Sequence, residues 1–368
     1  MTSSSIQHIK EKFFKGERLS FEDGVALYAS NDLFALADMA NHIRKQKSGR
    51  QVFYNVNRHI NYSNICKLSC SFCAFQRKEG DEGAYTFSVN QILERARQAS
   101  LEGATELHMV GGLHPTAPFS YYLEFLSAIK KNFPQLHLKC FTAIEIIHLS
   151  KVSGLSIKDT LLKLKEAGLD SMPGGGAEIF YPEVRKKICP EKETADEWLA
   201  VHKQAHEIGF RTNATMLYGM VEKPEHRVDH VLRLRELQDQ TGGFQAFIPL
   251  AFHPKTNEKG VDGIWSTGLN DIKTYAISRI LLDNFQHVKV YWSMLGLKLA
   301  QIMLGFGVDD FDGTVMEEKI YHEAGSDMPQ SINAAYIQKL IKEAGYDPVE
   351  RDTLYRKVIR SGKELTYA

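Results

Sequence analysis

Short apolar runs alternate with stretches of helical periodicity along nearly the whole chain. In the helical stretches apolar residues recur three and four positions apart, as Val89, Ile92 and Ala96 do, with polar residues between them. This alternation is typical of βα units that build a parallel sheet. The candidate strands are Arg58–Tyr62, Glu106–Val110, His137–Thr142, the neighbourhood of Ser171, Arg211–Leu217, Gln245–Phe252, Val288–Trp292 and Val308–Phe311. Eight strands predict the α/β class and a complete (β/α)8 barrel of the TIM type, whose reacting groups stand at the C-terminal strand ends.

Helices are predicted on both sides of the barrel. Ser20-Phe-Glu-Asp23 resembles a capping box, and a second helix start lies at Asn31 or Asp32. After the last strand, Ser331 is placed to cap a helix that Gly345 ends. We therefore predict three parts: N-terminal helices that close the barrel over residues 1–50, the barrel over 51–325, and a C-terminal helix and tail packed on it over 326–368.

The composition limits the classes of function. The 368 residues carry 45 lysines and arginines against 45 aspartates and glutamates, so no overall field attracts nucleic acid or an anionic membrane. The N-terminus lacks an apolar signal region, and no run of about 18 apolar residues is present. Five cysteines, three of them clustered, agree with a reducing compartment. We expect a cytoplasmic protein that acts on a small molecule.

Cys66, Cys70 and Cys73 form a C-x3-C-x2-C pattern. Three cysteines can hold a [4Fe-4S] cluster and leave one iron open for chemistry, whereas a ferredoxin cluster is closed by a fourth cysteine. The remaining cysteines, Cys140 and Cys189, are remote in the sequence. A zinc knuckle is the alternative, but no fourth Cys or His follows at the spacing of a structural zinc site. The pattern favours an iron–sulfur centre with an open coordination site.

This spacing, with Phe72 directly before the third cysteine, resembles the signature of the radical S-adenosylmethionine (SAM) superfamily. The resemblance implies that the amino and carboxylate groups of SAM bind the open iron. It also implies that one electron, from a reduced flavodoxin or ferredoxin-type donor, splits SAM to give a 5′-deoxyadenosyl radical. Backbone atoms near Phe72 are then expected to contact the edge of the adenine.

Two loops are predicted to contribute to the binding of SAM. Gly111 and Gly112 resemble the paired glycines whose backbone binds its amino group in the superfamily, although Leu113 replaces the usual acidic residue. Thr142 and Glu145 follow the third strand, where a carboxylate is expected to point into the site. The alternative for Glu145 is a helix N-terminal charge that the helix dipole favours.

Further SAM contacts are predicted after the fourth and fifth strands. Glu178 and Arg185 follow a run of three glycines in a region that contacts the ribose and carboxylate of SAM in the superfamily. Arg185 is suited to a two-pronged hydrogen bond to that carboxylate. The fifth strand resembles the superfamily's G-x-I-x-G-x-x-E adenine element, with threonine at its first position. This resemblance places Leu217 against the adenine.

The substrate is expected to contact Arg77, His114 and His253. Arg77 lies in the loop of the cysteines, His114 follows the second strand, and His253 stands where the sixth strand ends. A solvated loop charge is the alternative for Arg77. Tyr291 and Trp292, on the seventh strand, suit an aromatic substrate, and barrel core packing is their alternative.

Several stretches resemble the radical SAM enzymes of the futalosine route to menaquinone. They are Asn57–Asn61, Cys73–Gly80, Pro173–Phe180, Asn213–Gly219, Gly243–His253 and Asp352–Tyr355. The resemblance implies addition of the adenosyl radical to the enol-ether bond of 3-[(1-carboxyvinyl)oxy]benzoate, with rearrangement and decarboxylation. The alternatives are a related enzyme of that route whose radical abstracts hydrogen, and a non-catalytic iron–sulfur electron carrier that binds no SAM.

Overall fold

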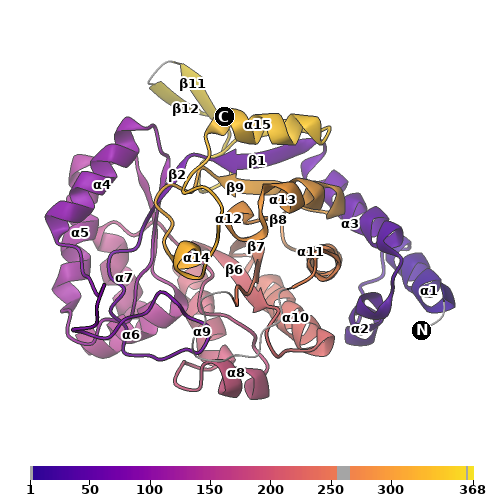
Figure 1. The fold of residues 1–368 in the computed structure, drawn as a ribbon, viewed down its shortest axis with the longest axis horizontal. Coiled ribbons are helices and arrows are strands. Elements are labelled where there is room, and N and C mark those ends of the chain that lie inside the picture. Colours follow the sequence, from indigo (N-terminus) through magenta and orange to yellow (C-terminus); the bar gives the residue numbers. More distant parts are fainter. Residues whose placement is uncertain (1–2, 255–265, 362–363) are drawn as a thin grey trace.

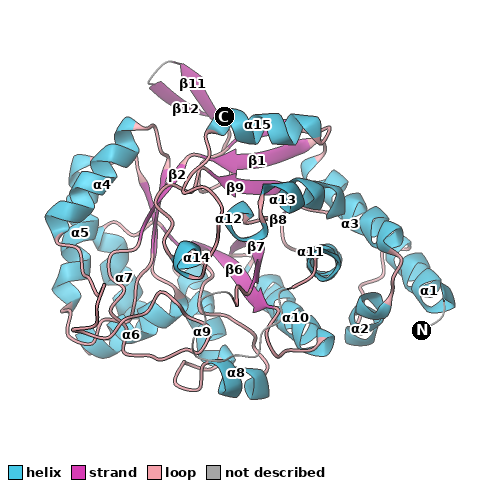
Figure 2. Ribbon diagram, in the orientation of Figure 1, coloured by secondary structure: helices cyan, strands magenta, loops and turns pink. Residues whose placement is uncertain are grey.

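A computed structural model describes residues 3–254, 266–361 and 364–368. Its centre is a curled sheet of seven parallel strands in chain order, with helices around it (Figure 1, Figure 2). The strands are β2 (Asn57–Ile60), β3 (Glu106–Met109), β4 (His137–Cys140), β5 (Ser171–Met172), β6 (Arg211–Tyr218), β7 (Phe244–Ala251) and β8 (His287–Val288). The chain order of the strands follows from crossover helices that return the chain to the next position in the sheet. The predicted α/β class is confirmed.

The predicted eighth strand, β9 (Asp310–Gly313), does not join this sheet through a regular ladder. It pairs with β1 (Gln51–Asn55), a strand that the sequence analysis missed, and meets the chain after β8 through one bridge at Lys289. A second bridge joins Met316 to Arg58 of β2. A left-handed φ of 62° at the third residue of β9 interrupts its extended backbone. Short bridges therefore close the expected barrel in place of a continuous ladder.

The predicted strand Val288–Trp292 is also shorter in the structure, because Trp292 already begins helix α12 (Trp292–Leu295). A turn of helix at this point ends the sheet early. It separates the two neighbouring aromatic side chains, Tyr291 and Trp292, into different surroundings, as described below.

The outer layer consists of amphipathic helices. In α4, Ser88 and Gln91 form a capping box, and Ile92, Ala96 and Ala99 are buried on one face. The helices between strands are α4 (Val89–Leu101), α5 (Phe119–Asn132), α6 (Ala143–Ser153), α7 (Ile157–Ala167), α8 (Pro182–Ile188), α9 (Ala195–Glu207), α10 (Pro224–Thr241) and α11 (Gly268–Leu281); α13 (Leu297–Met303) and the 3-10 turn η1 (Leu304–Phe306) follow α12. Among the described residues, no helix combines the length and apolar character needed to cross a bilayer.

Three helices precede the barrel: α1 (Ser3–Phe14), α2 (Phe21–Ala29) and α3 (Leu33–Ser48). Ser20 and Asp23 form the predicted capping box of α2, and Asp32 caps α3. Helix α1 was not predicted. Both α2 and α3 pack against α11, and α2 also packs against α10, on the right of Figure 1. The N-terminal segment is thus part of the outer helical layer.

The C-terminal segment contributes strands as well as the predicted helix, α15 (Ala334–Glu343), which Asn333 caps instead of Ser331. Strand β10 (Asp347–Glu350) pairs with β1, and β11 (Val358–Ser361) and β12 (Glu364–Tyr367) form a hairpin. Between them Arg351 Nε and Tyr355 Oη both donate to Asp310 Oδ2 at 2.7 Å. The tail therefore fills the floor of the barrel, at the N-terminal end of β9.

Candidate active site

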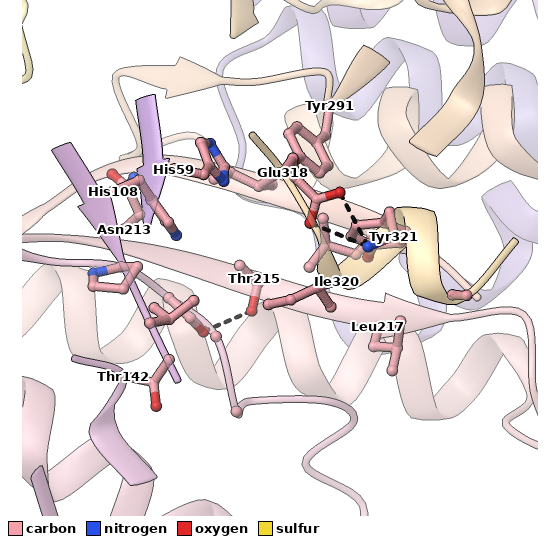
Figure 3. Close-up of a pocket in the computed structure, with 18 of the residues that line it drawn as sticks. His59, His108, Thr142, Asn213, Thr215, Leu217, Tyr291, Glu318, Ile320 and Tyr321 are labelled. Carbon is pink, nitrogen blue, oxygen red and sulfur yellow. Dashed lines mark hydrogen bonds between the residues drawn. The ribbon is translucent and has the colours of Figure 1, made fainter. Parts of the chain in front are cut away.

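One cavity of about 290 Å³ opens at the C-terminal ends of the strands (Figure 3). It extends from the loop of the three cysteines to the inner faces of β2, β3 and β4. The short helix α14 (Ile320–Glu323) contributes to its wall. Of the predicted site residues, Phe72, Cys73, Thr142, Glu178, Leu217 and His253 are on this wall. Cys66, Cys70, Arg77, Gly111, Gly112, His114, Glu145 and Arg185 lie outside it.

The loop of the cysteines is held in shape by its own cations. Lys78 Nζ donates to three successive carbonyls, those of residues 66–68, at 2.8–3.0 Å. Arg77 donates to the carbonyls of Ala74 and Gln76 at 2.7 and 3.0 Å. Ser71 ties the loop to α8 by two hydrogen bonds to the carbonyl of Ile188. Arg77 therefore supports the loop backbone and lies off the cavity wall, and its predicted contact with the substrate stays a prediction.

The three cysteines are free thiols on this loop. Burial raises the pKa of Cys70 to about 12 and raises that of Cys73 as well, so a metal must displace the proton before either thiol becomes a ligand. In the described part of the chain, no three Cys, His or carboxylate side chains converge closely enough to bind a single metal ion. Cys66, Cys70 and Cys73 lie on one loop, as the three ligands of a [4Fe-4S] cluster would.

The paired glycines pack against the cysteine loop. A Cβ on Gly112 would lie 2.2 Å from the carbonyl oxygen of Ile65, and a Cβ on Gly111 would lie 2.7 Å from the Tyr62 ring. Gly112 N–H donates to the carbonyl of Ser63 at 2.8 Å. Among the described residues, neither glycine carbonyl accepts a hydrogen bond. Close packing therefore explains why both positions are glycine, and their carbonyls remain as acceptors.

Glu145 is a buried carboxylate whose hydrogen-bond donors come from the protein itself. Its carboxylate accepts from Tyr62 Oη at 2.5 Å, from Gly111 N–H at 3.1 Å and from Thr142 N–H at 2.7 Å. Burial raises its pKa. With Thr142 it forms the capping box of α6. The helix N-terminal role, the alternative in the sequence analysis, describes Glu145 better than contact with SAM, and only Thr142 of this pair reaches the cavity.

A substitution at Gly112 tests the packing of this region. Gly112→Ala should lower the free energy of unfolding by about 1–3 kcal/mol, because the added methyl group would push Ile65 and the cysteine loop outward. The variant should also retain less iron than the parent after reconstitution. The matched control is Gly305→Ala, since a Cβ at Gly305 meets open space and needs no positive φ. Equal iron content and melting temperature in Gly112→Ala and the parent would contradict this account.

Glu178 and Lys192 form a buried ion pair at the cysteine end of the cavity. Lys192 Nζ lies 2.6 Å from Glu178 Oε1, and the side chains are 11% and 10% exposed. Burial by itself would lower the pKa of Lys192, but the charges of Glu178, Cys70 and Cys189 raise it. The ammonium also lies 5.2 Å from the centroid of the Phe72 ring. Lys192, which the sequence analysis missed, is thus a charged lysine beside the cysteine loop.

Arg185 fixes the backbone on both sides of Glu178. Its guanidinium donates to the carbonyls of Ala177 at 2.6 Å and Ile179 at 3.4 Å, and to that of Glu193. Glu178 itself has a left-handed φ of 49°, which is uncommon for a residue other than glycine. Backbone carbonyls take the Nη donors of Arg185, which favours a positioning role, and its contact with the SAM carboxylate stays a prediction.

The two predicted substrate histidines have different surroundings. His253 is on the cavity wall, donates from Nε2 to the carbonyl of Met294 at 2.8 Å and packs against the Tyr321 ring at 5.7 Å. His114 Nδ1 instead accepts from the backbone N–H groups of Thr116 and Ala117 at 3.2 and 3.1 Å. His253 therefore remains a candidate for substrate contact, whereas His114 shapes its own loop.

Only one of the two predicted aromatic residues reaches the cavity. Tyr291 is on its wall (Figure 3). Trp292 is fully buried and donates from Nε1 to the carbonyl of Gly313 at 2.8 Å. Trp292 is thus barrel core, the alternative that the sequence analysis kept open.

The polar inner end of the cavity was not predicted from the sequence. It is built by residues on the inward faces of the strands and just after them: Asn57, His59, His108, Lys139, Asn213, Lys289 and Asp312. Their period-two spacing within strands, as in Asn57 and His59, was the available signal. The predicted site residues lay at strand ends instead, because barrel enzymes carry their reacting groups there.

Comparison with protein families matches residues 60–234 to the radical SAM superfamily and residues 241–362 to the CofH/MqnC C-terminal region. The second match runs past residue 325, where the sequence analysis placed the end of the barrel. The floor-filling tail as far as β11 thus falls within one family region.

Characterised relatives cover nearly the whole chain. The aminodeoxyfutalosine synthase of Thermus thermophilus is 48% identical over 353 residues, which are 95% of each chain. That of Streptomyces coelicolor is 46% identical over 367 residues, 96% of this chain and 94% of the relative. The 5-amino-6-(D-ribitylamino)uracil–L-tyrosine 4-hydroxyphenyl transferase of Methanococcoides burtonii is 41% identical over 356 residues, 95% and 98% of the two chains.

Solved structures show the same fold at low sequence identity. Methylornithine synthase superposes with a TM-score of 0.72 at 16% identity, over 92% of this chain and 97% of the other. The FeFe-hydrogenase maturase HydG of Carboxydothermus hydrogenoformans superposes with a TM-score of 0.74 at 17% identity, over 96% and 81%. Together with the family matches and the high identity to the synthases, this shows that the chain is a radical SAM enzyme of the family that includes the aminodeoxyfutalosine synthases.

Proposed function

We propose that this enzyme makes 6-amino-6-deoxyfutalosine from SAM and 3-[(1-carboxyvinyl)oxy]benzoate in menaquinone biosynthesis. The C5′–S bond of SAM breaks, and C5′ bonds to the vinyl CH2 carbon. The aryl group moves from oxygen to the carbon that bears the carboxyl group, the oxygen becomes a ketone, and that carboxyl group leaves as CO2. The products are 6-amino-6-deoxyfutalosine, methionine and CO2. The one electron that enters is returned, so SAM is consumed without net oxidation or reduction.

Cys66, Cys70 and Cys73 are the residues that would hold the [4Fe-4S] cluster. The cluster would supply the electron for SAM cleavage, drawn from a reduced flavodoxin or ferredoxin-type donor. The hydrogen bonds from Lys78 to the carbonyls of residues 66–68 support this assignment, because they fix the loop independently of a metal.

For SAM, the structure offers acceptors and a cation near the cysteine loop. The carbonyls of Gly111 and Gly112, which accept no hydrogen bond from the described part of the chain, suit the methionine ammonium group. Lys192, beside Glu178 and the Phe72 ring, is our candidate for the methionine carboxylate in place of Arg185, and Glu178 suits the ribose hydroxyls. Leu217, on the wall at the end of β6, offers an apolar surface for the adenine (Figure 3).

One observation carries the choice of substrate: the cavity is continuous from Cys73 to a polar inner end. The wall also carries apolar side chains, among them Val110, Ile248 and Leu250. A cavity with both apolar and cationic lining suits a benzene ring that bears carboxylates. The identity of 46–48% to the two synthases supports the same choice.

Two other radical reactions are the alternatives. One is the 4-hydroxyphenyl transfer named for the archaeal relative at 41% identity, and the other is the hydrogen abstraction of cyclic dehypoxanthine futalosine synthase. Reconstituted enzyme should be incubated anaerobically with SAM and reductant, and offered the enol-ether benzoate, dehypoxanthine futalosine, or tyrosine with 5-amino-6-(D-ribitylamino)uracil in separate reactions. We expect SAM-dependent product from the enol-ether benzoate alone. Turnover of only one of the other substrates would replace the proposal by that reaction, and a protein that binds no SAM would be an electron carrier.

A substitution of His253 tests its contact with the substrate. His253→Ala should keep the cluster and bind SAM, but the ratio of adduct to 5′-deoxyadenosine should fall by about 10–100-fold, because a misplaced double bond lets the radical react elsewhere. The ratio is measured by chromatography of anaerobic reactions. His8→Ala, an exposed position on α1, is the control. An unchanged ratio in His253→Ala would remove this residue from the substrate site.

A further inference from the structure

The inner end of the cavity holds cationic and neutral donors. We infer that it binds the ring carboxylate of the substrate through Lys139, Lys289, His59 and His108. This inference deepens the proposed function and rests on it for the identity of the ligand. The predicted substrate residues Arg77, His114 and His253 lie elsewhere: two of them are off the wall, and His253 is at the strand end.

Three of the donors form a row across adjacent strands. The strand register pairs His59 of β2 with His108 of β3, and His108 with Lys139 of β4. The two imidazole rings stack with centroids 4.6 Å apart and planes 19° from parallel. In Figure 3 the two histidines lie side by side with Asn213 near them, while Leu217 is at the opposite end of the cavity. The row therefore lies far from the adenine side.

Both histidines can donate to an anion. Burial lowers the pKa of His59, and it lowers that of His108 to well below its usual value. Each ring is thus neutral near pH 7 and carries one N–H group. His59 is only 8% exposed, and within the described ranges neither ring has a hydrogen-bond partner. Both rings line the cavity, so their N–H groups are available to an acceptor oxygen of a ligand.

Each lysine is held by one carboxylate and has donors to spare. Lys139 Nζ lies 2.6 Å from Glu106 Oε1, and Lys289 Nζ lies 3.1 Å from Asp312 Oδ1. The lysine side chains are 5% and 4% exposed. Thr353 from the tail donates to the other oxygen of Glu106 at 2.8 Å, so that oxygen is also fixed. An ammonium group has three donors, and one partner leaves the others for a ligand.

The distribution of charge favours an anion at this end. Glu106 is fully buried and is not on the wall, so Lys139 presents its charge to the cavity without a facing acid of its own. Asp312 is on the wall but is paired with Lys289. Of the other acids on the described wall, Glu178 is paired with Lys192. Glu318 lies close enough for its charge to act on His59, and its Oε2 is 3.1 Å from His322 Nδ1. A carboxylate between Lys139 and Lys289 would relieve their mutual repulsion.

The chemistry of the substrate selects the ring carboxylate for this end. The other carboxylate is attached to the vinyl group, so it must stay near SAM when the double bond meets C5′. The ring carboxylate lies across the benzene ring from that bond. It is also kept in the product, so an anchor on it holds the ring in place while the aryl group migrates.

The test uses the cluster-loaded enzyme with SAM and without reductant, so that no turnover occurs, and measures binding by anaerobic calorimetry. The probes are 3-(carboxymethoxy)benzoate, which has both carboxylates, 3-methoxybenzoate, which has only the ring carboxylate, and phenoxyacetate, which has only the other. Lys289→Met/Asp312→Asn removes the cation without leaving a buried charge unpaired. We expect affinity for the first two probes to fall at least about tenfold, as for the loss of a hydrogen bond to a charged group. Affinity for phenoxyacetate should change less than about twofold by the same reasoning.

The control is Lys163→Met/Glu166→Gln, which removes a surface ion pair of similar length, 2.9 Å. His59→Gln is a milder second variant, used if the double variant does not fold. It should weaken binding of the two probes with a ring carboxylate more than binding of phenoxyacetate. Equal weakening of all three probes, or of phenoxyacetate alone, would overturn the inference, as would unchanged affinity for 3-methoxybenzoate.

The test of the carboxylate site and the test of the proposed reaction can fail independently of each other. Binding that depends on Lys289 in an enzyme that forms no adduct would leave the carboxylate site standing and refute the reaction. Adduct formation by an enzyme whose affinity for the probes does not depend on Lys289 and His59 would support the reaction and refute the carboxylate site.

Discussion

Replacement of Cys66, Cys70 or Cys73 by Ala should abolish both the cluster and SAM cleavage. The three thiols share one loop, and Cys73 faces the cavity, so the loss of any one opens the cluster to solvent and to loss of iron. Iron analysis and the visible absorbance of the reconstituted proteins measure the effect, and 5′-deoxyadenosine release under reducing conditions measures cleavage.

Cys140→Ala and Cys189→Ala are the controls and should keep about four irons per chain. Cys189 is the more stringent of the two, because its thiol is near enough to Cys70 to influence the pKa of that residue. Cys140 is buried at the end of β4. Loss of iron in either control, or full iron in any of the three loop variants, would contradict the assignment of the ligands.

Lys192→Met should destabilise the protein by about 3–5 kcal/mol, because it leaves the Glu178 carboxylate buried without its partner. It should also weaken SAM binding at least about tenfold, as expected for the loss of a charge-assisted hydrogen bond. Chemical denaturation measures the first effect and anaerobic calorimetry with SAM measures the second.

The double variant Glu178→Gln/Lys192→Met separates the two effects. It has no unpaired buried charge, so it should regain most of the lost stability, yet SAM binding should stay weak because the cation is absent. If SAM binding recovered together with stability, Lys192 would be only a structural partner of Glu178. Arg185→Leu offers a further contrast, since its guanidinium contacts backbone carbonyls and its loss should act through the position of Glu178.

Local signals in the sequence were enough for the class of fold and for the cysteine loop. The strands of the central sheet could be found because apolar runs alternate with amphipathic helices, and the helix starts at Ser20 and Asp32 follow from cap chemistry. The eighth strand was predicted at nearly the right place. Its pairing with β1 and the bridges that close the barrel depend on contacts between distant residues, which no local pattern contains.

The candidate site was predicted in part, for a related reason. Glu178, Leu217 and His253 were found because polar residues and motif positions at strand ends point to a barrel's active face. Arg185 and Lys192 are both cations after the same loop, and the sequence does not distinguish the one that binds backbone carbonyls from the one that pairs with Glu178. The inner residues, such as Lys139 and Lys289, sit within or just after strands and face inward only once the sheet has curled.

The central claim is that the adenosyl group becomes part of the product, and the fate of the adenine tests it most directly. Reconstituted enzyme is incubated anaerobically with reductant, the enol-ether benzoate and SAM labelled in the adenine ring, and the products are separated by chromatography. The account predicts that the label co-elutes with an aromatic product, one adenine for each aromatic ring, and that methionine is formed in equal amount. Label found only in free 5′-deoxyadenosine, while the enol-ether benzoate is consumed without it, would contradict addition and establish hydrogen abstraction.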